Sequence, residues 1–158
     1  MSAVLQQQES QFNRWVTFRL AEEIYGINVM QVQEVLRVTE VAPVPGAPSS
    51  VLGILNLRGN VVTVVDAREL FGLPRNDTTD QTRIMIVEIN KIIVGMLVDS
   101  VAEVVNIHNG DIDAPPSIGN DDRSRYIQGV YSKNGEILIL VDLNRLMGPD
   151  AQFIQAGA

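Results

Sequence analysis

Apolar and polar positions alternate along most of this chain with the period of two that is typical of β-strands. The densest example lies in residues 53–72, where an apolar segment precedes an Arg58-Gly59-Asn60 turn and a valine-rich segment follows it. Glycine supplies the positive φ that tight hairpin turns need, so this stretch predicts a β-hairpin. Asp66 ends the second strand, and residues 67–71 predict one or two helical turns that end at Gly72.

Similar patterns predict strands on both sides of this hairpin. Residues 29–36 are ambiguous and fit either a short helix or a continuing strand. Pro43, Pro45 and Pro48 exclude a long regular element around them. A polar connector at 73–82 divides the chain, and a last helical turn is expected at 142–147. The other predicted strands are residues 14–20, 24–28, 83–89, 92–98, 101–107, 126–132 and 136–141, with turns at Asn90-Lys91 and Asn134-Gly135.

The two parts of the chain resemble each other. Under a shift of 76 positions Gly53 meets Gly129 and Gly59 meets Gly135, and under a shift of 69 Gly26 meets Gly95. The second shift also places Glu34-Val35 on Glu103-Val104, and the longer loop at 108–125 absorbs the difference between the shifts. These ordered matches favour an internal duplication.

Each repeat has about five short strands with glycine at the bends, which is the pattern of a small closed barrel. We therefore predict a mostly β protein made of two similar five-stranded β-barrels with short helical turns. The predicted organisation is a flexible tail at residues 1–13, a first barrel half at 14–80, a second at 81–148 and a C-terminal tail at 149–158, with approximate boundaries.

Composition excludes several classes of function. The chain of 158 residues has no cysteine, so it has neither disulfides nor thiolate metal sites. A net charge of −7 and an aromatic content of 5% disfavour nucleic acid as a partner. No apolar run approaches the ~20 residues that cross a bilayer, and residues 1–11 lack the regions of a signal peptide. We expect a cytoplasmic protein without direct membrane insertion.

Candidate sites for chemistry are scarce. His108 is the single histidine and, next to Asn109-Gly110, is expected to be a turn residue. The acidic pairs Glu22-Glu23 and Asp121-Asp122 lack the alternating ligand spacing of a calcium loop and are interpreted as solvated charge. Neither a phosphate-binding loop nor a nucleophile elbow is present in the sequence. We expect no catalytic residue, no metal site and no cofactor, which favours a binding module over an enzyme.

Positions that differ in chemistry between the repeats are the stronger candidates for binding. Arg58 aligns with Asn134, the residue that a tight Asn-Gly turn prefers, and Leu57 aligns with Lys133. Met30 likewise aligns with Asp99, so the second-repeat positions are expected to be solvated. Arginine, methionine and aromatic residues are enriched at protein interfaces, and the first repeat therefore predicts a protein-binding surface. The alternative is that Leu57 and Met30 fill the core and Arg58 lies in solvent.

A set of short motifs spread along the chain carries a family resemblance. They are Tyr25-Gly26-Ile27, Val32-Gln33-Glu34-Val35, Gly53, Asn56-Leu57-Arg58-Gly59, Val64-Val65-Asp66, Val94-Gly95, Val98-Asp99 and Ile139-Leu140-Val141. In these motifs the chain resembles the CheW family of bacterial chemotaxis adaptors, from about Phe18 to Met147. Thr63 departs from the proline that many relatives have there, which affects strand detail more than partner choice. The family's two SH3-like barrels, intertwined at their termini, agree with the duplication.

The resemblance implies a non-enzymatic coupler that is monomeric when free. It would link the regulatory domain of a CheA-type histidine kinase to the cytoplasmic hairpin tip of chemoreceptors, within membrane-associated arrays. By motif position, the implied partner-binding residues are Val32, Glu34, Asn56, Leu57 and Arg58, and the glycines that shape their scaffold are Gly53, Gly59 and Gly95. Two alternatives stay open: an adaptor of a twitching-motility or other chemosensory pathway, and a barrel that binds a small ligand.

Overall fold

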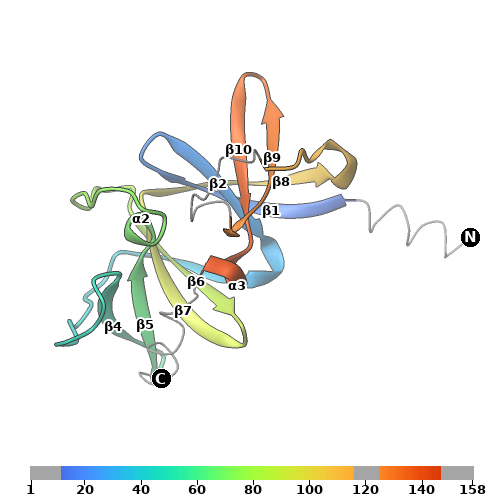
Figure 1. The fold of residues 1–158 in the computed structure, drawn as a ribbon. Helices are drawn as coiled ribbons and strands as arrows, with labels where there is room; N and C mark the ends of the chain where they lie inside the picture. The colour runs from blue at the N-terminus through green and yellow to red at the C-terminus, as the bar shows by residue number, and fades with distance from the viewer. Residues whose placement is uncertain (1–11, 116–124, 147–158) are drawn as a thin grey trace, which may run out of the picture.

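The computed structural model describes residues 12–115 and 125–146, and short strands make up most of the regular secondary structure in these ranges (Figure 1). The first part of the chain contains β1 (Phe12–Leu20), β2 (Glu23–Asn28), η1 (Val29–Gln31), β3 (Val32–Arg37), β4 (Val51–Leu57), β5 (Asn60–Asp66) and α2 (Ala67–Leu70). The second contains β6 (Arg83–Ile89), β7 (Ile92–Val98), β8 (Ser100–His108), η2 (Asn109–Asp111), β9 (Ile127–Lys133), β10 (Glu136–Val141) and α3 (Leu143–Leu146).

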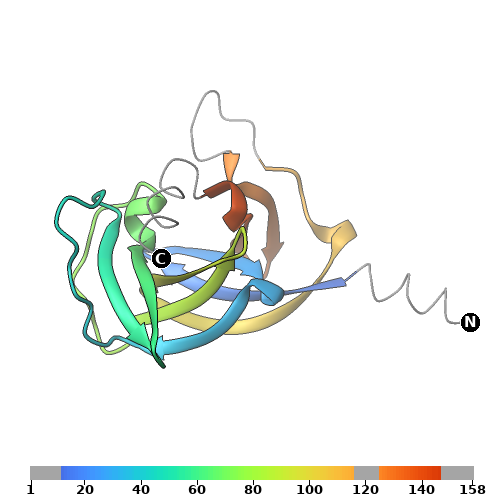
Figure 2. The ribbon, with the colours of Figure 1, turned by 90° about the horizontal axis from the view of Figure 1, so that it is seen from below.

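The strands form two five-stranded sheets that lie side by side (Figures 1 and 2). Sheet A has the order β8-β1-β2-β10-β9, and sheet B has the order β3-β6-β7-β5-β4. Neighbouring strands are antiparallel except for β2 with β10 and β5 with β7, which are parallel. The two five-stranded sheets and short helices confirm the predicted mostly β fold.

The two sheets are copies of one topology. If β1 to β5 are replaced in order by β6 to β10, and the reverse, the strand order of sheet A becomes that of sheet B. The registers correspond as well, because the parallel pair Tyr25 and Ile139 in sheet A matches the pair Val94 and Thr63 in sheet B under the shifts found in the sequence. This correspondence supports the internal duplication.

The sheets do not follow the two sequence halves, 14–80 and 81–148. Sheet B takes the consecutive strands β3 to β7, whereas sheet A combines β1 and β2 with β8 to β10. The separation begins at η1, whose 3-10 turn directs the chain from β2 in sheet A to β3 in sheet B. Residues 12 and 13 belong to β1 and pair with β8, so the strand starts inside the predicted tail. The predicted tail at 149–158 lies outside the described residues.

One large apolar core joins the sheets, and a smaller core lies within each curved sheet, called barrel A for sheet A and barrel B for sheet B. The shared core contains a stack of aromatic rings in which Phe71 lies 4.7 Å from Tyr25 and 5.1 Å from Tyr126, measured between ring centroids. Barrel B is filled around Leu55, Val62, Val64, Ile84 and Ile86, and barrel A around Trp15, Ile107 and Leu140. Each fully buried apolar side chain contributes roughly 1.5 to 3 kcal/mol, so the shared core holds the sheets together.

Three local predictions are refined by the structure. The ambiguous segment 29–36 is both a short 3-10 helix and the beginning of β3. The β4–β5 turn consists of Arg58 and Gly59 alone, because Asn60 already pairs with Leu57 in the strand ladder. The imidazole Nδ1 of His108 accepts a hydrogen bond from the Gly110 amide at 3.0 Å, which makes this histidine a turn residue as expected.

Candidate functional site

The β4–β5 turn places Arg58 in a backbone conformation that arginine does not favour. Arg58 has φ 52° and Gly59 has φ 89°, and the Asn56 side-chain oxygen accepts a hydrogen bond from the Gly59 amide at 2.8 Å. Asn134 has φ 51° in the equivalent turn of sheet A. Because asparagine tolerates this left-handed conformation better than other non-glycine residues, turn chemistry does not explain the arginine.

The Arg58 side chain reaches across the open side of sheet B to Glu34. Its Nη1 donates to Oε1 of Glu34 at 3.2 Å, and its Nη2 donates to Oε2 in a second, shorter hydrogen bond. Glu34 lies on β3 and Arg58 follows β4, and these strands are the two edges of sheet B. The forked ion pair therefore ties the two edges of the barrel together.

This pair lies at the surface rather than in the core. The side chain of Arg58 is 69% exposed and that of Glu34 is 29% exposed. The hydrogen bond from Arg58, reinforced by its charge, holds the pKa of Glu34 below its ordinary value, and the same bond raises the pKa of Arg58. Both groups are thus charged at neutral pH, and solvent or a protein partner can reach them.

The other predicted binding residues lie on β3 and β4, the strands that carry or precede the two members of the pair, but in different environments. Leu57 is partly buried and packs against the core inside barrel B, and Val32 packs in the same way against the shared core. Asn56 is exposed, and its oxygen serves the turn. The structure thus brings Glu34 and Arg58 into contact, while Asn56 and Leu57 support the hairpin that carries Arg58.

Glycine is required at the three predicted scaffold positions for different structural reasons. Gly53 has φ 152°, and a Cβ atom placed there would lie 2.1 Å from the Ala42 carbonyl oxygen. Gly95 is buried, and its Cβ would lie 3.1 Å from Cγ2 of Ile84. Gly59 has no such neighbour within 4 Å and is needed only for its φ. Gly53 and Gly95 therefore act as spacers inside the scaffold.

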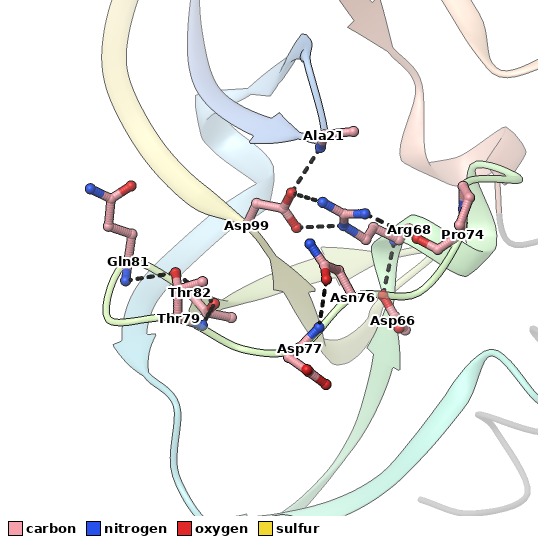
Figure 3. Close-up of polar contacts among 10 residues, drawn as sticks. All are labelled: Ala21, Asp66, Arg68, Pro74, Asn76, Asp77, Thr79, Gln81, Thr82 and Asp99. Atoms are coloured by element: carbon pink, nitrogen blue, oxygen red, sulfur yellow. Dashed lines mark hydrogen bonds and ion pairs between the residues drawn. The ribbon is translucent and has the colours of Figure 1, made fainter.

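Met30 and Asp99 occupy equivalent positions of the two repeats, but the surroundings of their side chains differ more than the sequence indicated. Met30 is 84% exposed, which excludes the alternative in which it fills the core. Asp99 was expected to be solvated, but it accepts hydrogen bonds from the Ala21 amide and from Nε of Arg68, both at 2.8 Å (Figure 3). The reason is topological, since the β1–β2 turn and α2 both meet the β7–β8 turn.

Asp99 is the centre of a polar network that sequence reasoning missed. Burial acts to raise the pKa of Asp99, but hydrogen bonds from Arg68 and the Ala21 amide, together with the charge of Arg68, lower it below its ordinary value. Nη1 of Arg68 also donates to the Pro74 carbonyl at 3.0 Å (Figure 3). The network links a turn of sheet A to the helix and connector that follow β5. The only sequence signal for this network was the difference in chemistry between Met30 and Asp99, which align in the two repeats.

Residues 12–115 and 125–146 contain neither a membrane-spanning helix nor a cluster of metal ligands. No helix in these ranges is long and apolar enough to span a membrane. The same part of the chain contains no group of three or more histidine, cysteine, aspartate or glutamate residues that could hold a metal ion.

Comparison with known proteins gives consistent matches along the chain. Residues 14–150 match the family model described as CheW-like domain. The chemotaxis protein CheW of Rhizobium meliloti (strain 1021) is 32% identical over 129 residues, which are 82% of this chain and 83% of the relative. The chemotaxis protein CheW of Treponema pallidum (strain Nichols) is 34% identical over 138 residues, 83% of this chain and 79% of the relative.

A solved structure gives the same result for the fold. The crystal structure of scaffolding protein TtCheW from Thermoanaerobacter tengcongensis superposes with a TM-score of 0.79 and 32% sequence identity. The match covers 86% of this chain and 92% of that structure.

Proposed function

Because this chain belongs to the CheW-like domain family, we propose that it is a non-enzymatic coupling protein of bacterial chemotaxis. In this function it links the cytoplasmic tips of chemoreceptors to a CheA-type histidine kinase, so that receptor conformation controls autophosphorylation. It acts in the cytoplasm at membrane-associated receptor arrays. Two relatives that match more than four-fifths of this chain are chemotaxis proteins by name, which supports the proposal.

The observation that carries the binding mechanism is the exposed Arg58–Glu34 pair. A guanidinium has five N–H donors, and Glu34 occupies two of them. None of the remaining donors bonds to a residue that the structure describes, so they can bond to a carboxylate or carbonyl of a partner, while Glu34 fixes the plane of the guanidinium. In this arrangement Arg58 binds the partner and Glu34 is a positioning residue.

Apolar surface next to the pair supplies the rest of the contact. Val61 follows the turn on β5, in the same hairpin as Arg58, and is 52% exposed. An amphipathic receptor helix offers apolar side chains that can cover such a position. Because signalling interfaces are often small, an array gains strength from many such contacts acting together.

The proposal is tested by reconstituting the purified chain with receptor signalling fragments and a CheA-type kinase. We expect the chain to raise receptor-dependent autophosphorylation of the kinase. Arg58→Asn removes the guanidinium and keeps a residue that suits the turn, so the variant should fold normally and bind about 30-fold more weakly. Arg37→Asn, which changes an exposed arginine elsewhere on β3, is the matched control and should bind normally.

Two results would contradict the proposal in different ways. If the unmodified chain does not stimulate the kinase with receptor fragments from a pathway encoded with it, the coupling function is wrong. If the chain couples normally but Arg58→Asn is as effective as Arg37→Asn, the function stands and the binding role of Arg58 is wrong. Circular dichroism of each variant shows whether the fold is retained.

A further inference from the structure

Sheet A contains an open groove between its two edge strands. The groove has a volume of about 250 Å³ and lies between β8 on one side and the β9–β10 hairpin on the other. Its apolar lining includes Val105, Ile107, Tyr131 and Leu138, which also pack against the small core of barrel A. The groove therefore leads from the surface to the interior of this barrel.

The internal repeat shows what occupies the corresponding place in sheet B. Glu103 on β8 corresponds to Glu34 on β3, and Asn134 in the β9–β10 turn corresponds to Arg58. In sheet B the arginine spans the two edges and bonds to the glutamate. In sheet A the asparagine side chain is shorter and uncharged, and Glu103 forms no ion pair with any residue that the structure describes.

The residue that precedes the hairpin turn also differs between the two sheets. Leu57 packs against the core inside barrel B, but its counterpart Lys133 is exposed at the edge of the groove. Arg19 and Lys133 supply two positive charges to the lining, and Glu103 and Glu136 supply two negative charges. The groove is thus electrically balanced, with an apolar floor and a carboxylate at the position where sheet B binds a guanidinium.

We propose that this groove binds a β-hairpin of another protein, which presents an arginine to Glu103 and an apolar side chain to Tyr131 and Leu138. The two sites then use the same chemistry, with the arginine supplied by the chain itself in sheet B and by a partner in sheet A. A forked arginine suits Glu103 better than lysine does, because its planar donors match both carboxylate oxygens. A second copy of this chain is a poorer donor, since its Arg58 is already bonded to Glu34.

The chain itself provides the probe for a direct test. A cyclised peptide with the sequence of residues 53–66 presents Leu57 and Arg58 at a hairpin turn, and a matched peptide carries asparagine in place of this arginine. The protein has one tryptophan, Trp15, which packs in the core of barrel A with Ile107 and Leu138, so its fluorescence reports on the groove. Backbone amide NMR spectra of the full chain locate the bound peptide.

The expected result is saturable binding with NMR shifts on β8, β9 and β10. The asparagine peptide should bind roughly tenfold more weakly, and Glu103→Gln should weaken the arginine peptide by a similar factor. Glu40→Gln, which changes an exposed carboxylate outside the groove, should have no effect. A variant that combines Lys133→Leu with Asn134→Arg supplies the missing pair within the chain and should exclude the peptide.

Several outcomes would overturn the proposal. They are absence of binding, equal binding of the two peptides, or NMR shifts confined to sheet B. Self-association of the chain through the groove, detected by analytical ultracentrifugation, would show that the occupant is a second copy instead. None of these measurements uses kinase or receptor, so the result is independent of the coupling function.

Discussion

Gly53→Ala is the substitution for which the structure predicts the largest effect from a single added methyl group. The new Cβ atom would lie 2.1 Å from the Ala42 carbonyl oxygen and 2.7 Å from the Ala42 carbonyl carbon. Both are backbone atoms, so rotation of a side chain cannot relieve the overlap. The segment containing Ala42 must therefore move away from β4.

The cost of this movement has two parts. Ala42 and Ile54 exchange two backbone hydrogen bonds of 2.8 and 2.9 Å, and losing both costs about 2 kcal/mol. Alanine at φ 152° adds backbone strain of about 1 to 3 kcal/mol. We expect Gly53→Ala to lower the free energy of unfolding by about 3 to 5 kcal/mol.

Two other glycines separate these contributions. Gly59→Ala tests strain alone, because Gly59 has φ 89° and no contact within 4 Å, and it should cost about 1 to 2 kcal/mol. Gly129→Ala tests crowding at the equivalent position of sheet A. Its Cβ would meet Cγ2 of Ile112 at 2.4 Å and the Asp113 carbonyl oxygen at 3.1 Å, and a side chain can move more easily than backbone.

Urea denaturation followed by circular dichroism measures all three variants on one scale. The expected order of destabilisation is Gly53→Ala, then Gly129→Ala, then Gly59→Ala. If Gly53→Ala is no more destabilising than Gly59→Ala, the close approach of Ala42 does not constrain the fold and the reasoning fails. If it is strongly destabilising, a functional defect at Gly53 is explained by the scaffold without any contact to a partner.

Three further predictions concern charge and packing. Arg58→Glu should abolish kinase coupling. The double variant that adds Glu34→Arg should restore the ion pair and thermal stability but not kinase coupling. If the double variant recovers thermal stability and kinase coupling together, the pair has only a structural role. The pKa of Asp99 is lower in the folded state than in the unfolded state. The ionised Asp99 carboxylate therefore stabilises the folded protein above the unfolded pKa of about 3.9, and this stabilisation is lost as the pH falls through the folded value. Asp99→Asn should therefore cost about 1 to 2 kcal/mol at pH 7, and urea titrations should show this difference shrinking below about pH 4; a pH-independent difference would refute it. Phe71→Ala should cost about 3 to 5 kcal/mol in the same titrations, because the ring is 1% exposed in the shared core, and a loss below about 1 kcal/mol would contradict its central place.

The positions of the strands could be predicted from the sequence, but their partners could not. A period of two reports which face of a strand is buried, and turn residues report where strands end. Neither signal says which strand lies alongside. The pairing of β2 with β10 joins residues such as Gly26 and Leu140, and it depends on the three-dimensional course of the chain after η1.

For the candidate site, the sequence likewise indicated the residues but not the contact between them. Comparison of the repeats singled out Arg58 because Asn134 suits the same turn better. Its partner Glu34 was selected through family resemblance, and the contact between them was not expected. The two residues meet because the opposite edges of sheet B approach each other, and a linear pattern of residues contains no information about that curvature.

The arrangement of the two sheets also sets an order for folding during synthesis. Sheet B is complete once β7 has left the ribosome, and it can then bury its own core. Sheet A cannot be completed until β10 has emerged. Both edges of the β1–β2 hairpin therefore stay unpaired while the strands of sheet B are synthesised. Unpaired edges favour association with other chains, so this order of synthesis exposes the β1–β2 hairpin to such association for longer than the strands of sheet B.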